Sequence, residues 1–193
     1  MWTYHNPPRI EASPGFLLML GILFWLDEGV GLLPCGLIAC FLHELGHLAA
    51  AAVLDGTIKE ISFTVIGAEL RIDYKKPLTY GQESFVALSG PAANLLFGAL
   101  AHIMKWHLLE VISLAVGAFN LLPVLPLDGG QVVYARLAAR LDPDWAERLM
   151  TAVSGCLVGA LVGVGVVSAV HYANVTLLLT ALWLLAGVLR RGG

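Results

Sequence analysis

The sequence predicts an all-α polytopic membrane protein with about six transmembrane helices, on the basis of its composition, its apolar segments and its basic residues. Hydrophobic side chains make up 58% of the 193 residues and only 13% are charged, and the mean hydropathy is +0.80. Soluble domains average about 45 to 50% apolar and about 25% charged residues. The net charge of -3 offers no basic excess that would favour nucleic acid as a partner.

Apolar segments account for most of the chain. They lie at 14–26, 30–54, 84–104, 106–122, 149–170 and 172–189. Most approach the length of about 20 residues that a spanning helix needs. The first segment is short and is followed by Asp27 and Glu28, so it needs flanking residues or a thinned bilayer to cross.

Basic residues give an independent indication of topology. If all six segments cross, one side of the membrane receives Arg9, Lys59, Arg71, Lys75, Lys76, Arg136, Arg140, Arg148, Arg190 and Arg191, and the other receives Lys105. The positive-inside rule then predicts that both termini are cytoplasmic. If the first segment does not cross, only the amino terminus changes sides.

The segment 57-TIKEISFTVIGAELRIDY-74 differs from the apolar segments around it. It is dense in β-branched and aromatic residues, and Gly67 separates two such runs. This pattern predicts a small β-hairpin after the second span. An amphipathic surface hairpin on the cytoplasmic side is one interpretation, and an edge that pairs with an extended peptide is the other.

The motif 43-HELGH-47 places three ionisable side chains inside the second apolar segment. His43 and His47 are one helical turn apart on nearly the same face, so their nitrogens can share a metal ion. Glu44 is displaced around the helix and suits a carboxylate beside a metal-bound water. An ionisable side chain at membrane depth costs about 2.5 to 3.5 kcal/mol on insertion scales, which argues against a chance occurrence.

Two histidines make an incomplete metal site, and the best candidate for a third ligand lies in 120-NLLPVLPLDGGQV-132. Pro123 and Pro126 end or kink the fourth span, and the two glycines after Asp128 permit tight turns and close backbone approach. Asp128 therefore sits on broken backbone at the cytoplasmic end of a span. It suits a metal ligand, and the alternative is a cap on an amphipathic helix at 131–141.

Together these motifs resemble the site-2 protease family of intramembrane zinc metalloproteases. The pairing of HELGH with NLLPVLPLDGG carries the resemblance, and 89-SGPAAN-94 matches a Gly-Pro-x-x-Asn signature of that family. The chain is most similar to the compact bacterial branch typified by the stage IV sporulation protease. The resemblance covers nearly the whole chain.

The resemblance implies one zinc ion per chain, bound between the second and fourth spans by His43, His47 and Asp128. Glu44 is then the catalytic acid and base, and Asn120 is the asparagine that precedes the ligand aspartate. The expected reaction is hydrolysis of a peptide bond by zinc-activated water. The Asn120 amide would either stabilise the developing oxyanion or hydrogen-bond carbonyls freed by the prolines.

Gly90, Pro91 and Asn94 are candidates for substrate binding or structural support. The glycine and proline would thin and kink the third span for close packing. Asn94 would brace the hairpin or the Asp128 loop, or contact the substrate.

The same resemblance predicts regulated intramembrane proteolysis of a membrane-protein substrate near the cytoplasmic face. Candidate substrates are a transcription-factor precursor and an anti-sigma factor, and a membrane inhibitor protein is a candidate partner. We expect a single multi-pass domain, residues 1–193, in a prokaryotic cell membrane. There is no room for a PDZ module or for a carboxy-terminal nucleotide-sensing module.

Two other functions use the same residues. A metal transporter could employ His43, His47 and Asp128 as a transit site, but it would not need Glu44 in its motif position. A degenerate relative could act as a binding scaffold only, yet every expected catalytic position is filled in this sequence.

Overall fold

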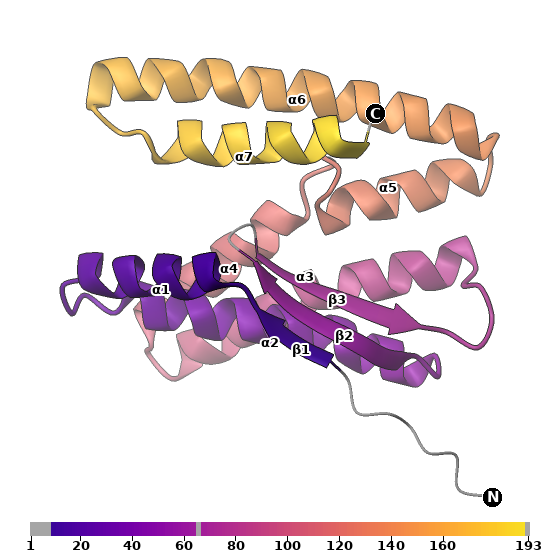
Figure 1. The fold of residues 1–193 in the computed structure, drawn as a ribbon, viewed down its shortest axis with the longest axis horizontal. Coiled ribbons are helices and arrows are strands. Elements are labelled where there is room, and N and C mark those ends of the chain that lie inside the picture. The colour runs from indigo at the N-terminus through magenta and orange to yellow at the C-terminus, as the bar shows by residue number, and fades with distance from the viewer. Residues whose placement is uncertain (1–8, 65–66, 192–193) are drawn as a thin grey trace, which may run out of the picture.

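The computed structural model describes residues 9–64 and 67–191, and this part of the chain is mainly helical with one small sheet (Figure 1). The elements in chain order are β1 (Arg9–Ala12), α1 (Pro14–Leu26), α2 (Leu32–Val53), β2 (Thr57–Thr64), β3 (Gly67–Asp73), α3 (Tyr80–Ile103), α4 (His107–Asn120), α5 (Asp128–Ala138), α6 (Pro143–Tyr172) and α7 (Thr176–Arg191). Each predicted apolar segment coincides with a helix.

Three helices of the described chain are long and apolar enough to cross a membrane by themselves, namely α2, α3 and α6. The helices α1, α4 and α7 are apolar but shorter. At a rise of about 1.5 Å per residue, they fall short of the hydrocarbon thickness of about 30 Å. The structure thus supports three of the six predicted spans by length, and the count of six stays a prediction.

The helices form two groups that α5 joins. In one group α2, α3 and α4 contact one another, and in the other α6 and α7 pack as a pair. Figure 1 shows α6 and α7, in orange and yellow, above the rest of the molecule, with α5 between the two groups. The helix α5 contacts α3 of the first group and α6 of the second group. A side chain in α5 can therefore reach the first group.

The predicted hairpin is confirmed, and it belongs to a sheet of three strands in the order β1-β2-β3. β2 and β3 are antiparallel, with Ile61 opposite Leu70, and the register shifts between Ile58 and Glu60. The strand β1 was not predicted; it pairs in parallel with β2, and Ile10 lies opposite Ile61. One edge of β2 is therefore occupied, and the outer edge of the hairpin belongs to β3.

The helix α3 begins four residues earlier than its predicted apolar segment because a capping box starts it. The Thr79 side chain accepts a hydrogen bond from the Gln82 amide, and the Gln82 side chain accepts one from the Thr79 amide. Pro91 lies inside α3. It has no amide hydrogen to donate to the carbonyl of Ala87, so the helix is weakened at this turn.

The hydrophobic core of the second group holds the connection between α4 and α5. Val124 and Leu127 of this connection are buried against Val158 of α6 and against Leu184 and Val188 of α7. The loop that leads to Asp128 is thus packed in protein, the condition under which irregular backbone is tolerated at membrane depth.

Candidate metal centre

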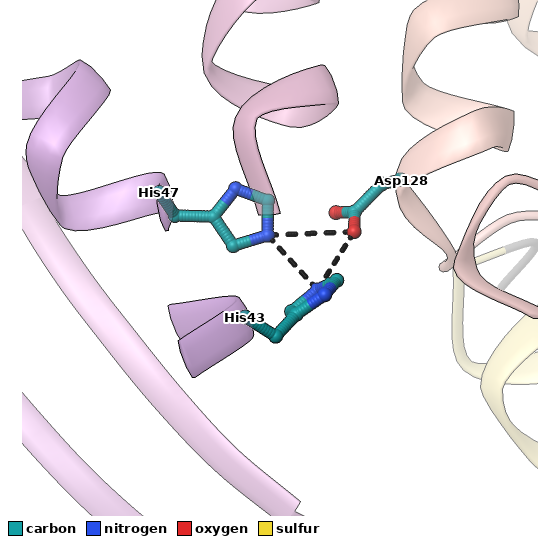
Figure 2. Close-up of side chains that lie close together, drawn as sticks. All are labelled: His43, His47 and Asp128. Carbon is teal, nitrogen blue, oxygen red and sulfur yellow. Dashed lines mark hydrogen bonds and ion pairs between the residues drawn. The ribbon is translucent and has the colours of Figure 1, made fainter. Parts of the chain in front are cut away.

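His43 and His47 point toward the same place from one face of α2, as their spacing predicts (Figure 2). Their Nε2 atoms are 3.1 Å apart, and the two rings meet edge to face with centroids 4.7 Å apart. His43 is buried, with 6% of its surface exposed. Both imidazoles therefore turn the same nitrogen toward a common point.

Asp128 reaches this point from the first turn of α5. Its Oδ2 atom lies 3.0 Å from His43 Nε2 and 3.4 Å from His47 Nε2. Among the described residues, these three form the group of His, Cys, Asp and Glu side chains whose donor atoms lie within 4.8 Å of one another. Residues 81 positions apart in the chain thus converge as predicted.

The geometry and chemistry of these three atoms fit a zinc ion. Zinc bonds to nitrogen and oxygen are about 2.0 to 2.2 Å long, which places tetrahedral ligand atoms about 3.3 to 3.5 Å apart. The three observed separations run from 3.0 to 3.4 Å. Asp128 Oδ2 is buried and makes no hydrogen bond within the described chain, although both rings are near. A cation at the common point would satisfy it.

Packing of the preceding loop determines where Asp128 lies. The Leu125 amide donates a buried hydrogen bond of 2.9 Å to the Ser154 hydroxyl of α6, and Val124 and Leu127 are buried in the core. Leu127 is the residue before α5, and no side chain caps the helix there. The capping alternative for Asp128 is therefore absent, because its carboxylate faces the histidines.

The two glycines after Asp128 serve close approach within the first turn of α5. A β-carbon at Gly130 would lie 2.5 Å from the carbonyl carbon of Val124, and one at Gly129 would lie 2.6 Å from the Leu122 oxygen. These neighbours are backbone atoms and cannot move independently. The predicted close approach is confirmed, but the glycines lie in a helix and the predicted tight turns are wrong.

The third span fixes the second histidine. His47 Nδ1 lies 2.8 Å from the carbonyl oxygen of Val86 in α3. Gly90, on the next turn, has no side chain, and a β-carbon there would lie 2.9 Å from His43 Nε2 and closer still to His47 Nε2. Gly90 and Pro91 are both buried. The Gly-Pro pair thus belongs to the wall of the candidate metal centre.

Glu44 lies beside this group and does not belong to it. Its side chain is partly buried and interacts electrostatically with His43, His47 and Asp128. Glu44 is thus an acidic neighbour of the three convergent side chains and not one of them.

The side chains of Asn94 and Asn120 make contacts that differ from those the sequence predicted. Asn94 is fully buried, and its Nδ2 atom lies 3.3 Å from His43 Nδ1. Asn120 donates its side-chain amide to the Val116 carbonyl, 3.0 Å away within α4. The Asn120 contact is structural, but Val116 lies seven residues before Pro123 and its carbonyl is not one that the prolines leave free, so the predicted contact is not the one observed. The Asn94 contact matches neither alternative, because the partner is a candidate ligand.

A cavity of about 410 Å³ lies between α3, α5 and α6, on the side that the basic residues predict to be cytoplasmic. Its lining residues are Glu83, Leu125, Gln131, Tyr134, Glu147 and Thr151. Leu125 and Gln131 flank Asp128 in the chain. The cavity therefore adjoins the turn that presents the candidate ligand, and it is polar enough to hold water.

Comparisons with known proteins agree with this arrangement. The profile described as Peptidase family M50 matches residues 99–161, the segment that contains Asp128. The stage IV sporulation protein FB of Bacillus subtilis is 28% identical over 157 residues, which is 77% of this chain and 54% of that protein. The chain is thus similar to members of peptidase family M50.

Two further proteins similar to this chain are named as metalloproteases. A zinc metalloprotease of Methanocaldococcus jannaschii is 25% identical over 65% of this chain and 39% of its own length. The putative zinc metalloprotease Rip3 of Mycobacterium tuberculosis is 31% identical over 62% of this chain and 34% of its own length. The chain thus spans about half or less of the length of the curated relatives it matches.

The fold has a solved counterpart. The site-2 protease from Methanocaldococcus jannaschii aligns with a TM-score of 0.74 over 98% of this chain and 94% of that one, at 21% identity. The three apolar helices, together with this fold, indicate a membrane protein.

Proposed function

We propose that this protein is an intramembrane zinc metalloendopeptidase, with His43, His47 and Asp128 as the zinc ligands and Glu44 as the catalytic base. The observation that carries the proposal is the convergence of three electron-rich atoms on one buried point. The family relationship supports the reaction class, because the relatives are named zinc metalloproteases. One zinc ion per chain is proposed.

The catalytic roles follow from the chemistry of the donor set. Zinc with three protein ligands supplies a Lewis acid that acidifies a water molecule and polarises a peptide carbonyl. Glu44 takes the proton of the attacking water and delivers it to the leaving amine. Asn120 is given a structural role in this proposal, because one N–H of its side-chain amide donates to the Val116 carbonyl within α4. Its second N–H stays available as an oxyanion donor, and Asn120→Ala tests that role.

The cut is proposed to lie near the cytoplasmic face. With six spans and cytoplasmic termini, α2 ends at that face at Val53. His43 and His47 then lie about 15 and 9 Å from this end along the helix axis. The cavity beside the Asp128 turn lies in the same region, with Glu83 and Glu147 in its lining.

A substrate helix must unwind locally before its peptide bonds can be hydrolysed, since all its amides are bonded internally. The unwound strand needs new hydrogen-bond partners. We propose that the outer edge of β3 supplies them by strand addition, because β1 occupies the corresponding edge of β2.

The substrate class is a transmembrane or membrane-associated protein, cleaved in regulated intramembrane proteolysis. A transcription-factor precursor or an anti-sigma factor fits a product released on the cytoplasmic side. A membrane inhibitor protein is a fitting regulator, and the setting is a multi-pass protein of a prokaryotic cell membrane.

The experiment that tests the proposal uses purified protein reconstituted with a single-span substrate. We expect about one zinc per chain and cleavage that Glu44→Gln abolishes while zinc remains bound. Zinc binding without hydrolysis would favour a transporter, and the absence of both would favour a scaffold. Full turnover by Glu44→Gln would remove the proposed catalytic base.

A further inference from the structure

The side chain of Asn94 is closed off from solvent in the middle of α3. It is 0% exposed, and its Cβ lies 3.1 Å from where a β-carbon of Gly117 in α4 would be, so α3 and α4 are in close contact at this point. Its polar contact in the described chain is the one between Nδ2 and His43 Nδ1. Its Oδ1 atom is buried and has no hydrogen-bond partner among the described residues.

The contact with His43 concerns the ring nitrogen that faces away from the candidate metal centre. His43 Nε2 faces His47 and Asp128, while Nδ1 faces Asn94. A neutral imidazole has its proton on one nitrogen only, and the hydrogen bond at one nitrogen determines the state of the other. A metal ligand needs a lone pair at Nε2 and therefore a proton at Nδ1.

The carboxamide of Asn94 can meet this need. Its oxygen and nitrogen occupy nearly the same space after a half-turn of the group, so either atom can face the ring. With the nitrogen facing Nδ1, the ring must accept there and Nε2 holds the proton. With the oxygen facing Nδ1, Asn94 Oδ1 accepts the proton of His43 Nδ1. His43 Nε2 then keeps its lone pair for a metal.

His47 provides an internal comparison. Its Nδ1 lies 2.8 Å from the Val86 carbonyl, an acceptor only, so its proton is on Nδ1 and its Nε2 is free. Metal-bound histidines generally donate their other N–H to a carbonyl or carboxylate in this way. Both acceptors, Val86 and Asn94, come from α3, and they lie two turns apart along it.

Building on the proposed zinc site, we propose that Asn94 is a positioning residue whose carboxamide oxygen accepts the Nδ1 proton of His43. It thereby holds the ring with Nε2 aimed at the metal. The amide nitrogen of Asn94 then faces away from the ring. The buried hydroxyl of Ser113 lies one turn from Gly117 on the same face of α4, and within the described residues it also has no hydrogen-bond partner.

The first part of the test is the tautomer of His43, which does not depend on zinc or on turnover. The metal-free protein studied carries Asp128→Ala and His47→Leu, which remove the two acceptors that face His43 Nε2. It is labelled with ¹⁵N-histidine and studied by NMR at a pH where the rings are neutral, and His43→Gln in the same background identifies the His43 signals. We expect the proton on Nδ1, and a proton on Nε2 would overturn the proposal.

The second part compares two replacements of Asn94 with a matched control. Asn94→Leu keeps the approximate size but has no acceptor, and Asn94→Asp keeps the acceptor. Ser84→Ala is the control, because it removes another buried polar group of α3, one that bonds to Tyr80 of its own helix. Zinc affinity is measured by competition with a chelator of known affinity.

We expect Asn94→Leu to weaken zinc binding about 10- to 100-fold, the usual effect of losing such a partner. It should also shift His43 toward the Nε2–H tautomer. Asn94→Asp and Ser84→Ala should stay within about threefold of the wild type. The proposal would be overturned if Asn94→Leu bound zinc as tightly as the wild type. It would also be overturned if Asn94→Asp lost as much zinc affinity as Asn94→Leu.

The outcomes separate this proposal from the proposed function. If the wild type binds no zinc, the metalloprotease assignment fails, while the spectrum still decides which atom of Asn94 faces His43. If the wild type binds zinc and Asn94→Leu changes neither tautomer nor affinity, only the role of Asn94 fails. If Asn94→Leu does not fold, two measurements still test the role of Asn94. They are the tautomer of His43 in protein that keeps Asn94 and the zinc affinity of Asn94→Asp.

Discussion

The Nδ1 atom of His47 lies 2.8 Å from the carbonyl oxygen of Val86, which joins α2 to α3 at the candidate metal centre. The bond orients the imidazole and leaves Nε2 free to face Asp128. A candidate ligand on one span thus depends on the backbone of another. Changes in α3 should therefore alter metal binding without removing a ligand.

Gly90→Ala tests this dependence. The new methyl group would meet the Nε2 atoms of both His43 and His47, so the rings must move or α3 must shift away from α2. Loss of a hydrogen-bond partner of a metal-binding histidine usually weakens metal binding about 10- to 100-fold. We expect Gly90→Ala to lower the zinc affinity by at least this much. Chelator competition on purified protein measures it.

The matched control for this substitution is Gly36→Ala. Gly36 lies in α2, and a β-carbon there would meet nothing within 4 Å. The control should bind zinc as the wild type does. Equal losses in the two variants would mean that the effect of Gly90→Ala is not local to the rings.

Ser154→Ala tests how the Asp128 loop is held. The substitution leaves the buried Leu125 amide without an acceptor, which costs about 1 to 3 kcal/mol of stability. We expect a lower unfolding temperature and weaker zinc binding, because the loop connects to the ligand. Thr180→Ala is a suitable comparison, since that exposed hydroxyl bonds only within α7. A stability loss with unchanged zinc affinity would separate the loop from the site.

Asn120→Ala distinguishes the two interpretations of that asparagine. Since the side chain donates to the Val116 carbonyl, we expect a stability loss of about 1 kcal/mol and a kcat within about tenfold of the wild type. Removal of a true oxyanion donor costs about 10² to 10³ in kcat. A fall of that size at unchanged zinc content would restore the catalytic role.

Proline scanning of β3 tests strand addition. Consecutive amides of a strand point to opposite edges, so of Leu70→Pro and Arg71→Pro one removes an outward donor and the other removes a bond to β2. The variant that removes the outward-pointing amide of β3 should cleave a helical substrate more slowly and should still bind zinc. Cleavage at the wild-type rate by both variants would exclude the β3 edge.

Local signals in the sequence predicted the elements well. The four-residue spacing of His43 and His47 fixes their common face in any helix, and the apolar segments locate the helices. The start of α6 was placed too late, because its first turn is polar. The sequence does contain a signal for this helix start, because Asp142 is the N-cap and Pro143 is the first residue of the helix. The same applies to α3 and its capping box at Thr79.

Contacts between distant segments were predicted less well. β1 has only four residues, too few for their alternation to be a clear signal, and Ile61, the partner of Ile10, is 51 positions away, so no local pattern indicates the pairing. Asn94 could not be paired with His43 from the sequence for the same reason. The approach of Asp128 was predicted because two histidines make an incomplete metal site and this carboxylate stands on proline-broken backbone, and the family resemblance supported the choice.

The account rests on one metal ion bound by two imidazoles and a carboxylate. X-ray absorption spectroscopy of the zinc-loaded protein measures this first shell directly. The account predicts one zinc per chain, two imidazole nitrogens at about 2.0 to 2.1 Å and oxygen at about 2.0 to 2.2 Å, a shell that Asp128→Ala alters. A sulfur at about 2.3 Å, or a single imidazole, would contradict it.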